Sequence, residues 1–130
     1  MAPVYGKWNS DWRDALDDAC QALEVESRKY LSAGVASGRV TIMGENGQLK
    51  NVTSSQIKKM TLGILAATFR NIVSKTAKDA VIGNALTQIN PERVGLAHNK
   101  PSKAVERRLR RNAGTHMWSI INCLKQMASK

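Results

Sequence analysis

Apolar residues recur every three or four positions along most of the chain, which is the spacing of one face of an α-helix. The clearest stretch covers residues 10–31, where the recurring apolar positions are Trp12, Ala15, Leu16, Ala19, Leu23 and Tyr30. The chain has only one Phe, two Tyr and three Trp, so its helices must meet through mainly aliphatic side chains. The pattern predicts an all-α protein of four to five helices with little strand.

Local signals predict where the middle helices begin and end. Thr53 and Gln56 have the spacing of a capping box, in which each side chain satisfies a free amide at a helix start. The apolar stripe then continues through Ile57, Met60, Ile64, Leu65, Thr68, Ile72 and Val73, and on to Ile89. One bent helix and two separate helices both fit this stripe. Asn90-Pro91 is expected to end it, because the residue before proline avoids helical geometry.

The ends of the chain are expected to form further helices. Asn9, Ser10 and Asp11 can cap the first helix. Ser102 can cap a short helix that Gly114 terminates, and Thr115 then caps a last helix. The buried face of that last helix is expected to be Met117, Ile120, Ile121, Leu124 and Met127.

Residues 32–52 contain glycine at positions 34, 38, 44 and 47 and are expected to form a flexible connection. Within it, residues 39–52 fit a small β-hairpin or an irregular loop. Cys20 and Cys123 lack the spacing of a metal site and are interpreted as small buried hydrophobic residues. A disulfide between them is the alternative.

The charge is large and uneven. The chain has 20 basic and 10 acidic residues, a formal charge of +10, and a pI of about 10.1. Residues 1–31 hold six of the acidic and four of the basic residues, so the excess lies beyond residue 31. Such an excess repels itself in the free protein and favours a polyanionic partner.

The segment "ERRLRRN" (residues 106–112) concentrates this charge. On a helix, Lys103, Arg107, Arg110 and Arg111 share one broad face that could grip successive phosphates, while Arg108 points elsewhere. A solvated face, or arginines that bridge to the acidic first helix, is the alternative. The full set of expected nucleic-acid contacts is Lys7, Lys58, Lys59, Arg70, Lys75, Lys78, Lys103, Arg107, Arg108, Arg110 and Arg111. No helix-turn-helix, zinc-finger or stacking motif accompanies them, so binding should not depend on base sequence.

The sequence offers little for catalysis. His98 and His116 have no metal-type spacing, and Asp14, Asp17 and Asp18 fit solvent positions that complement the helix dipole. No nucleophile lies in a recognisable motif. We therefore expect no enzyme activity, no metal and no cofactor. No apolar run approaches the roughly 20 residues of a membrane span, and no signal peptide is visible.

The segment "VYGKWN" (residues 4–9) resembles a short segment in major capsid proteins of filamentous archaeal double-stranded DNA viruses, the rudiviruses and lipothrixvirus-like groups. Those proteins are similar in length, basic and almost wholly helical. The resemblance implies an N-terminal helical arm that wraps DNA and a C-terminal helix bundle, here residues 1–52 and 53–130. It also implies dimers or paralogous heterodimers that stack into a helical nucleocapsid with A-form DNA.

The resemblance assigns roles to a few residues. Lys7 is carried over as a DNA contact, with Tyr5 and Trp8 as packing anchors for which core packing is the alternative. Trp8, Trp12 and Trp118 are candidates for interfaces between subunits. The expected location is the virion, after assembly in the host cytoplasm, and contact with an envelope is left open.

These observations predict a structural protein that packages double-stranded DNA. Two other interpretations remain open at this point. One is a small helical RNA-binding subunit of a ribonucleoprotein, such as a CRISPR effector complex. The other is a dimeric chromatin-like or phage accessory protein.

Overall fold

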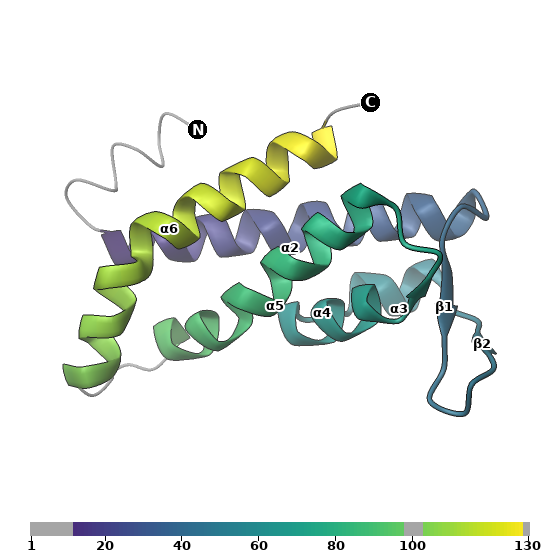
Figure 1. Cartoon of the computed structure of the whole chain (residues 1–130), viewed down its shortest axis with the longest axis horizontal. Coiled ribbons are helices and arrows are strands. Elements are labelled where there is room, and N and C mark those ends of the chain that lie inside the picture. The colour runs from purple at the N-terminus through teal and green to yellow at the C-terminus, as the bar shows by residue number, and fades with distance from the viewer. Residues whose placement is uncertain (1–11, 98–102, 129–130) are drawn as a thin grey trace.

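The computed structural model describes the backbone of residues 12–97 and 103–128 (Figure 1). Side chains are described for residues 14–91 and for most residues from 104 to 128. The elements follow in the order α2 (Trp12–Ala36), β1 (Thr41–Met43), β2 (Leu49–Lys50), α3 (Ser54–Lys58), α4 (Leu62–Arg70), β3 (Ile72–Val73), α5 (Ala77–Ala97) and α6 (Lys103–Ala128). The expected all-α fold of four to five helices with a small hairpin is confirmed.

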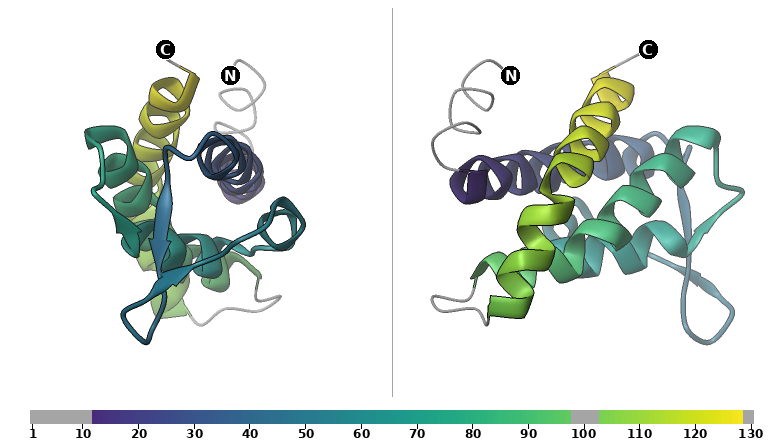
Figure 2. Two further views of the ribbon diagram at one scale, coloured as in Figure 1. Left: turned by 90° about the vertical axis from the view of Figure 1, so that its right-hand side faces the viewer. Right: turned by 60° about the vertical axis from the view of Figure 1, so that its left-hand side comes forward.

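One hydrophobic core is shared by helices from both halves of the chain. α6 packs against α2 and α5, and α5 also packs along α4 (Figures 1 and 2). The largest fully buried apolar side chains are Leu16, Leu23 and Leu31 of α2, Ile57 of α3, Leu65 and Phe69 of α4, Ile82, Leu86 and Ile89 of α5, and Ile120 of α6. Each contributes about 1.5–3 kcal/mol through burial, so this core supplies the main stabilising term.

The first helix buries the face that the sequence predicts. Ala15, Leu16, Ala19 and Leu23 are all at most 4% exposed. α2 nevertheless continues to Ala36, beyond the expected end at residue 31. It ends where Gly38 adopts a φ of +76°, and the amide of Gly38 donates to the carbonyl of Val35. Left-handed geometry of this kind is a common way for a helix to stop. The capping residues expected at positions 9–11 lie outside the described residues.

The hairpin within residues 39–52 is confirmed and gains a third strand. β1 pairs antiparallel with β2 on one side and with β3 on the other, giving the order β2-β1-β3. Ile42 lies opposite Lys50 in β2 and opposite Ile72 in β3. Placing Ile72 and Val73 in a helical stripe was wrong, because their backbone pairs with β1 instead.

The middle of the chain forms more and shorter helices than expected. The Thr53–Gln56 capping box is confirmed, since the Gln56 amide donates to Thr53 Oγ1 and Gln56 Oε1 accepts from the Thr53 amide. α3 is only five residues long, and α4 starts again at Leu62. Ile64 is 52% exposed, so the predicted stripe is only partly buried.

Two expected helix ends do not occur. α5 runs through Pro91 to Ala97, and α6 runs without a break through Gly114 and Thr115. A proline inside a helix removes one backbone hydrogen bond and costs about 3 kcal/mol. A glycine inside a helix costs only about 1 kcal/mol relative to alanine. Packing outweighs both costs, because α5 is held against α4 and α6, and an unbroken α6 aligns Ala113, Met117 and Ile120 on one buried face. Ser102, the expected cap, lies outside the described residues.

The buried face of the last helix agrees with expectation. Met117 and Ile120 are buried, and Ile121, Leu124 and Met127 are partly buried against the core. Cys20 and Cys123 are both buried free thiols, which confirms their interpretation as small hydrophobic residues.

Candidate nucleic-acid interface

The four arginines of residues 107–111 lie on the first half of α6. This half extends to the end of the subunit that lies opposite the β-hairpin (Figures 1 and 2). Arg107, Arg108, Arg110 and Arg111 are all exposed. We call these four residues the arginine patch. Arg108 and Arg110 also interact within the subunit, so Arg107 and Arg111 are the better probes of contacts with a partner.

α6 separates its charge from its packing surface. Ala113 is fully buried and Met117 is 5% exposed, whereas Trp118 is 68% exposed on the outward side. The positions of Arg107, Arg111 and Trp118 are spaced by four and seven residues, so all three share one helical face. Gly114 lies on the same face with open space around it. An exposed Trp beside cationic side chains is typical of a surface that a partner covers.

A second basic group lies toward the hairpin end of the molecule. We call it the lysine patch, and its members are Lys58, Lys59, Arg70, Lys75 and Lys78. All are exposed except Lys78, which is half-buried and interacts within the subunit. Lys58 and Arg70 lie in the last turns of α3 and α4, where positive charge also stabilises the negative end of the helix dipole.

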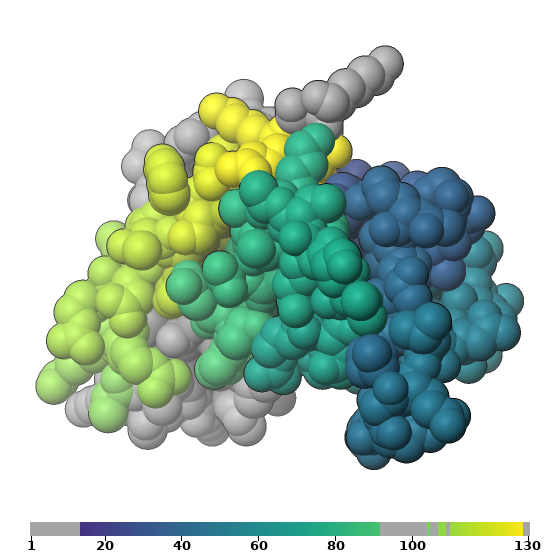
Figure 3. Space-filling view, turned by 45° about the vertical axis from the view of Figure 1, so that its right-hand side comes forward, coloured from purple at the N-terminus to yellow at the C-terminus, as the bar shows by residue number. Residues whose placement is uncertain are grey.

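The structure does not join the predicted basic residues into one continuous band. The arginine patch and the hairpin lie toward opposite ends of the molecule. In the space-filling view, the first half of α6 and the hairpin segment likewise lie on opposite sides (Figure 3). The long helices between the two ends, such as the 25-residue α2, measure about 38 Å at 1.5 Å per residue. One chain therefore presents two separated cationic surfaces.

The remaining predicted site residues are described only in part. Tyr5, Lys7 and Trp8 lie outside the described residues. Lys103 and Trp12 begin α6 and α2, and only their backbone is described. Their roles stay predictions.

The acidic first helix satisfies much of its charge locally. Arg28 Nη2 lies 2.9 Å from Glu24 Oε1, and Lys29 Nζ lies 3.3 Å from Glu26 Oε1. Both pairs join residues of α2 itself. Asp14 and Asp18 are exposed near the start of this helix. The exposed surface of α2 thus carries mixed charge and is less suited to a polyanion than the two basic patches.

A cluster of polar residues around the buried carboxylate of Asp79 is the feature that sequence reasoning missed. Asp79 is 2% exposed and accepts hydrogen bonds from the Tyr30 hydroxyl (2.8 Å) and the Thr76 amide (3.0 Å). Arg39 Nη1 lies 3.8 Å from Asp79 Oδ1, and the Arg39 guanidinium stacks 4.9 Å above the Tyr30 ring. The cluster joins α2, the segment before β1 and the start of α5. Its sequence signal was the Thr76-x-x-Asp79 spacing of a capping box.

The environment shifts the pKa values of this cluster. Burial alone would raise the pKa of Asp79, but hydrogen bonds from Thr76 and Tyr30 and the nearby Arg39 charge hold it below the usual 3.8. Burial, and then the hydrogen bond to Asp79, raise the pKa of Tyr30 above 10.0. Asp79 is therefore a charged buried group that its neighbours stabilise.

The described residues offer no group of three His, Cys, Asp or Glu side chains that could hold a metal ion. Burial raises the pKa of Cys20 to about 12 and that of Cys123 to about 11, so both thiols are protonated near neutral pH. None of the helices in the described part of the chain is long and apolar enough to cross a bilayer.

Comparison with protein-family models, with curated proteins and with solved structures returned no match for this chain.

Proposed function

We propose that this protein is a structural nucleocapsid protein that coats double-stranded DNA without sequence preference in a helical filament. The observation that carries the proposal is the exposure of the arginine patch and most of the lysine patch on a chain with a charge of +10. A fold that exposes so many cations at two ends has a strong electrostatic reason to bind a polyanion. The resemblance of residues 4–9 to filamentous-virus capsid proteins specifies the polyanion as duplex DNA.

The chemistry of the arginine patch suits phosphate contacts. A guanidinium donates paired hydrogen bonds to phosphate oxygens, and positions 107 and 111 repeat one helical turn apart. Contacts of this kind fix a protein on the duplex without reading its bases. We propose that the DNA is in the A-form, because packed helices along the duplex would exclude water.

The separation of the two patches favours repeated subunits over a single-site binder. With one patch at each end, a subunit can contact the duplex at two places, or contact it with one patch and a neighbouring subunit with the other. A homo-oligomer, or a heterodimer with a paralogous capsid protein, would place patches at regular intervals along the filament. The virion is then the proposed location.

The first test measures how DNA affinity depends on salt. Arg107→Ala combined with Arg111→Ala should reduce the slope of log K against log salt by about 2, because each lost phosphate contact changes it by about 0.9. The matched control is Lys29→Ala combined with Lys125→Ala, which removes two exposed charges outside both patches and should leave the slope unchanged. Equal slopes for the parent and the Arg107/Arg111 variant would assign these arginines to protein–protein contacts.

The second test examines the assembled material. Electron microscopy of purified protein with duplex DNA should show filaments of regular pitch, and nuclease digestion should identify the protected nucleic acid as double-stranded DNA. A helical reconstruction with the rise per base pair of B-form DNA would refute the A-form part of the proposal. Discrete particles that protect RNA would favour the ribonucleoprotein subunit instead.

A further inference from the structure

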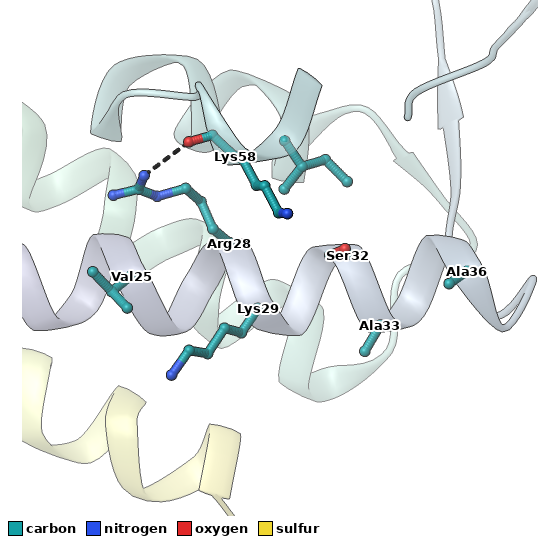
Figure 4. A pocket seen from close by; sticks show the side chains of 8 residues that line it. Val25, Arg28, Lys29, Ser32, Ala33, Ala36 and Lys58 are labelled. Atoms are coloured by element: carbon teal, nitrogen blue, oxygen red, sulfur yellow. Dashed lines mark hydrogen bonds between the residues drawn. The ribbon is translucent and has the colours of Figure 1, made fainter. Parts of the chain in front are cut away.

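Two hollows border the short helix α3, one toward α2 and the other toward β2. The hollow toward α2 has a volume of about 550 Å³, and Arg28, Lys29 and Lys58 stand around it (Figure 4). Arg28 Nη1 donates to the Lys58 carbonyl over 3.0 Å, and Arg28 Nη2 pairs with Glu24. Lys29 pairs with Glu26. Two of these three basic side chains are therefore already engaged within the chain.

The hollow toward β2 keeps its positive charge. It has a volume of about 310 Å³ and is lined by Lys50, Val52, Gln56, Lys59, Met60 and Ile64. We call it the β2–α4 pocket. Lys50 and Lys59 are both exposed, and neither forms an ion pair with any residue in the described part of the chain. The pocket therefore presents two cations that an acidic partner can pair with.

The rest of the lining is mainly apolar. Val52 and Met60 are 5% and 8% exposed and supply the base of the pocket. The Thr68 hydroxyl donates to the Met60 sulfur over 3.8 Å, which helps to hold that side chain in place. Ile64 of α4 is 52% exposed at the same pocket. A partner that fills the pocket must therefore bring apolar groups as well as negative charge.

β2 adds an open sheet edge beside this pocket. The strand order β2-β1-β3 leaves one side of β2 without a neighbouring strand among the described residues. The Gly44 amide donates to the Gln48 carbonyl over 2.7 Å, and hydrogen-bonded pairs alternate along an antiparallel ladder. The N–H and C=O of Leu49 therefore point away from β1, and the Leu49 side chain is 66% exposed.

We infer that the β2–α4 pocket and the edge of β2 bind an extended acidic segment of a partner protein, with aliphatic side chains between its carboxylates. Its backbone pairs with Leu49, as in the addition of a strand to a sheet edge. Side chains alternate between the faces of a strand, so the residues on either side of the one opposite Leu49 point to the face of Lys50. There the aliphatic groups cover Ile64, and the carboxylates pair with Lys50 and Lys59.

A peptide suits this surface better than duplex DNA. The sugar–phosphate backbone offers no aliphatic group for Leu49 and Ile64, whereas a peptide offers side chains for both and a backbone that matches the open edge. Lys59 also belongs to the lysine patch, so DNA and the acidic segment would compete for it. The inference does not depend on DNA binding, and its tests use nuclease-treated protein.

The first test measures binding of a defined probe by fluorescence anisotropy. The probe is a dye-labelled peptide, Glu-Glu-Leu-Val-Leu-Glu-Glu. Lys50→Glu combined with Lys59→Glu should raise its Kd about tenfold, because two attractive charge pairs become repulsive. Lys75→Glu combined with Lys125→Glu is the matched control, since it makes the same charge change at two exposed positions outside the pocket and should leave the Kd within about twofold.

The apolar part of the pocket is tested in the same assay. Ile64→Ser should raise the Kd roughly fivefold, because the probe can no longer cover an aliphatic side chain there. Val25→Ser, at an exposed apolar position outside the pocket, is its control and should leave the Kd unchanged. A second probe with serine in place of leucine and valine should bind at least fivefold more weakly. Circular dichroism checks that each variant is folded.

The last test locates the contact in the parent protein by hydrogen exchange measured with NMR. Saturation with the probe should slow exchange of the Leu49 amide at least fivefold and leave the amide of Glu45, in the hairpin loop, unchanged. No binding of the probe at millimolar concentration, or an unchanged Leu49 amide, would overturn the inference. Equal Kd values for the two probes would also overturn it, because the pocket would then attract any polyanion, DNA included.

Discussion

Asp79 offers the sharpest test of how the fold is held together, because it is a buried carboxylate with partners from three segments. Replacing it with alanine removes the carboxylate that accepts hydrogen bonds from the Tyr30 hydroxyl and the Thr76 amide. Each hydrogen bond to a charged group contributes about 1.5–3 kcal/mol, and the two lost here share one carboxylate, so their joint loss should cost about 3–5 kcal/mol. That is a large share of the roughly 5–15 kcal/mol that stabilises a typical domain.

The expected change in melting temperature follows from chain length. For 130 residues at about 2.1 cal/mol/K per residue, the unfolding entropy is roughly 270 cal/mol/K, so Asp79→Ala should lower the Tm by about 11–18 °C. Tyr30→Phe removes only one hydrogen bond to the carboxylate and should cost about 1–2 kcal/mol, or roughly 4–7 °C. Glu45→Ala, at an exposed position in the hairpin loop, is the control and should change stability by about 0.5 kcal/mol or less.

The assay is thermal and urea unfolding followed by circular dichroism, with a double-mutant cycle on Tyr30 and Asp79. The cycle should give a coupling energy of about 0.5–3 kcal/mol, as expected for residues in direct contact. If Asp79→Ala were no less stable than Glu45→Ala, the cluster would contribute nothing to the fold and the reasoning would fail.

The same cluster predicts a dependence on pH. The folded-state pKa of Asp79 lies below its usual value of 3.8, so the folded state favours the charged form. The resulting stability is fully present above about pH 5 and is lost as the pH falls through the folded-state pKa. Asp79→Ala should therefore lose less stability than the parent between pH 6 and pH 3. If the free energy of unfolding fell equally in the parent and in Asp79→Ala between pH 6 and pH 3, the lowered pKa of Asp79 would be contradicted.

Two further predictions concern helical glycines and buried thiols. A Cβ at Gly34 would lie 2.5 Å from Val40 Cγ2, so Gly34→Ala should destabilise the fold by about 1–3 kcal/mol. A Cβ at Gly114 would lie in open space, so Gly114→Ala should stabilise the fold by about 0.5–1 kcal/mol. Urea unfolding of both variants measures this contrast, and equal effects would refute the close packing of Val40 against Gly34 of α2. Cys20 and Cys123 should react with a thiol reagent at pH 8 only as fast as the protein unfolds, because burial raises the pKa of both thiols. Rapid labelling of the folded protein would show that one of them is accessible.

Several local features could be predicted because neighbouring residues determine them. The buried face of α2, the capping box of α3 and the β1–β2 hairpin each depend on a short run of sequence, namely apolar spacing, a Thr-x-x-Gln pattern and a glycine-rich loop.

The candidate site was less predictable, because its parts come from distant segments. The separation of the arginine patch from the lysine patch depends on the path of α5 and α6 across the subunit. The contact between α2 and α3 joins Arg28 to the Lys58 carbonyl and Ser32 to Ser54, which are 30 and 22 positions apart in the chain. No pattern within either segment contains those contacts.

The sequence by itself determined the helical class, the cationic surplus and the faces that must be buried, because each of these follows from residue type and spacing along a short stretch. Tertiary structure decided where helices stop and what Asp79 does. Gly114 and Pro91 are weak stop signals whose cost of about 1–3 kcal/mol is smaller than the gain from burying an unbroken α6 face and from packing α5 against its neighbours. Asp79 is charged in the core because the Thr76 amide beside it in the sequence donates to it, and because Tyr30 and Arg39, some 40 to 50 residues earlier in the chain, come to lie next to it.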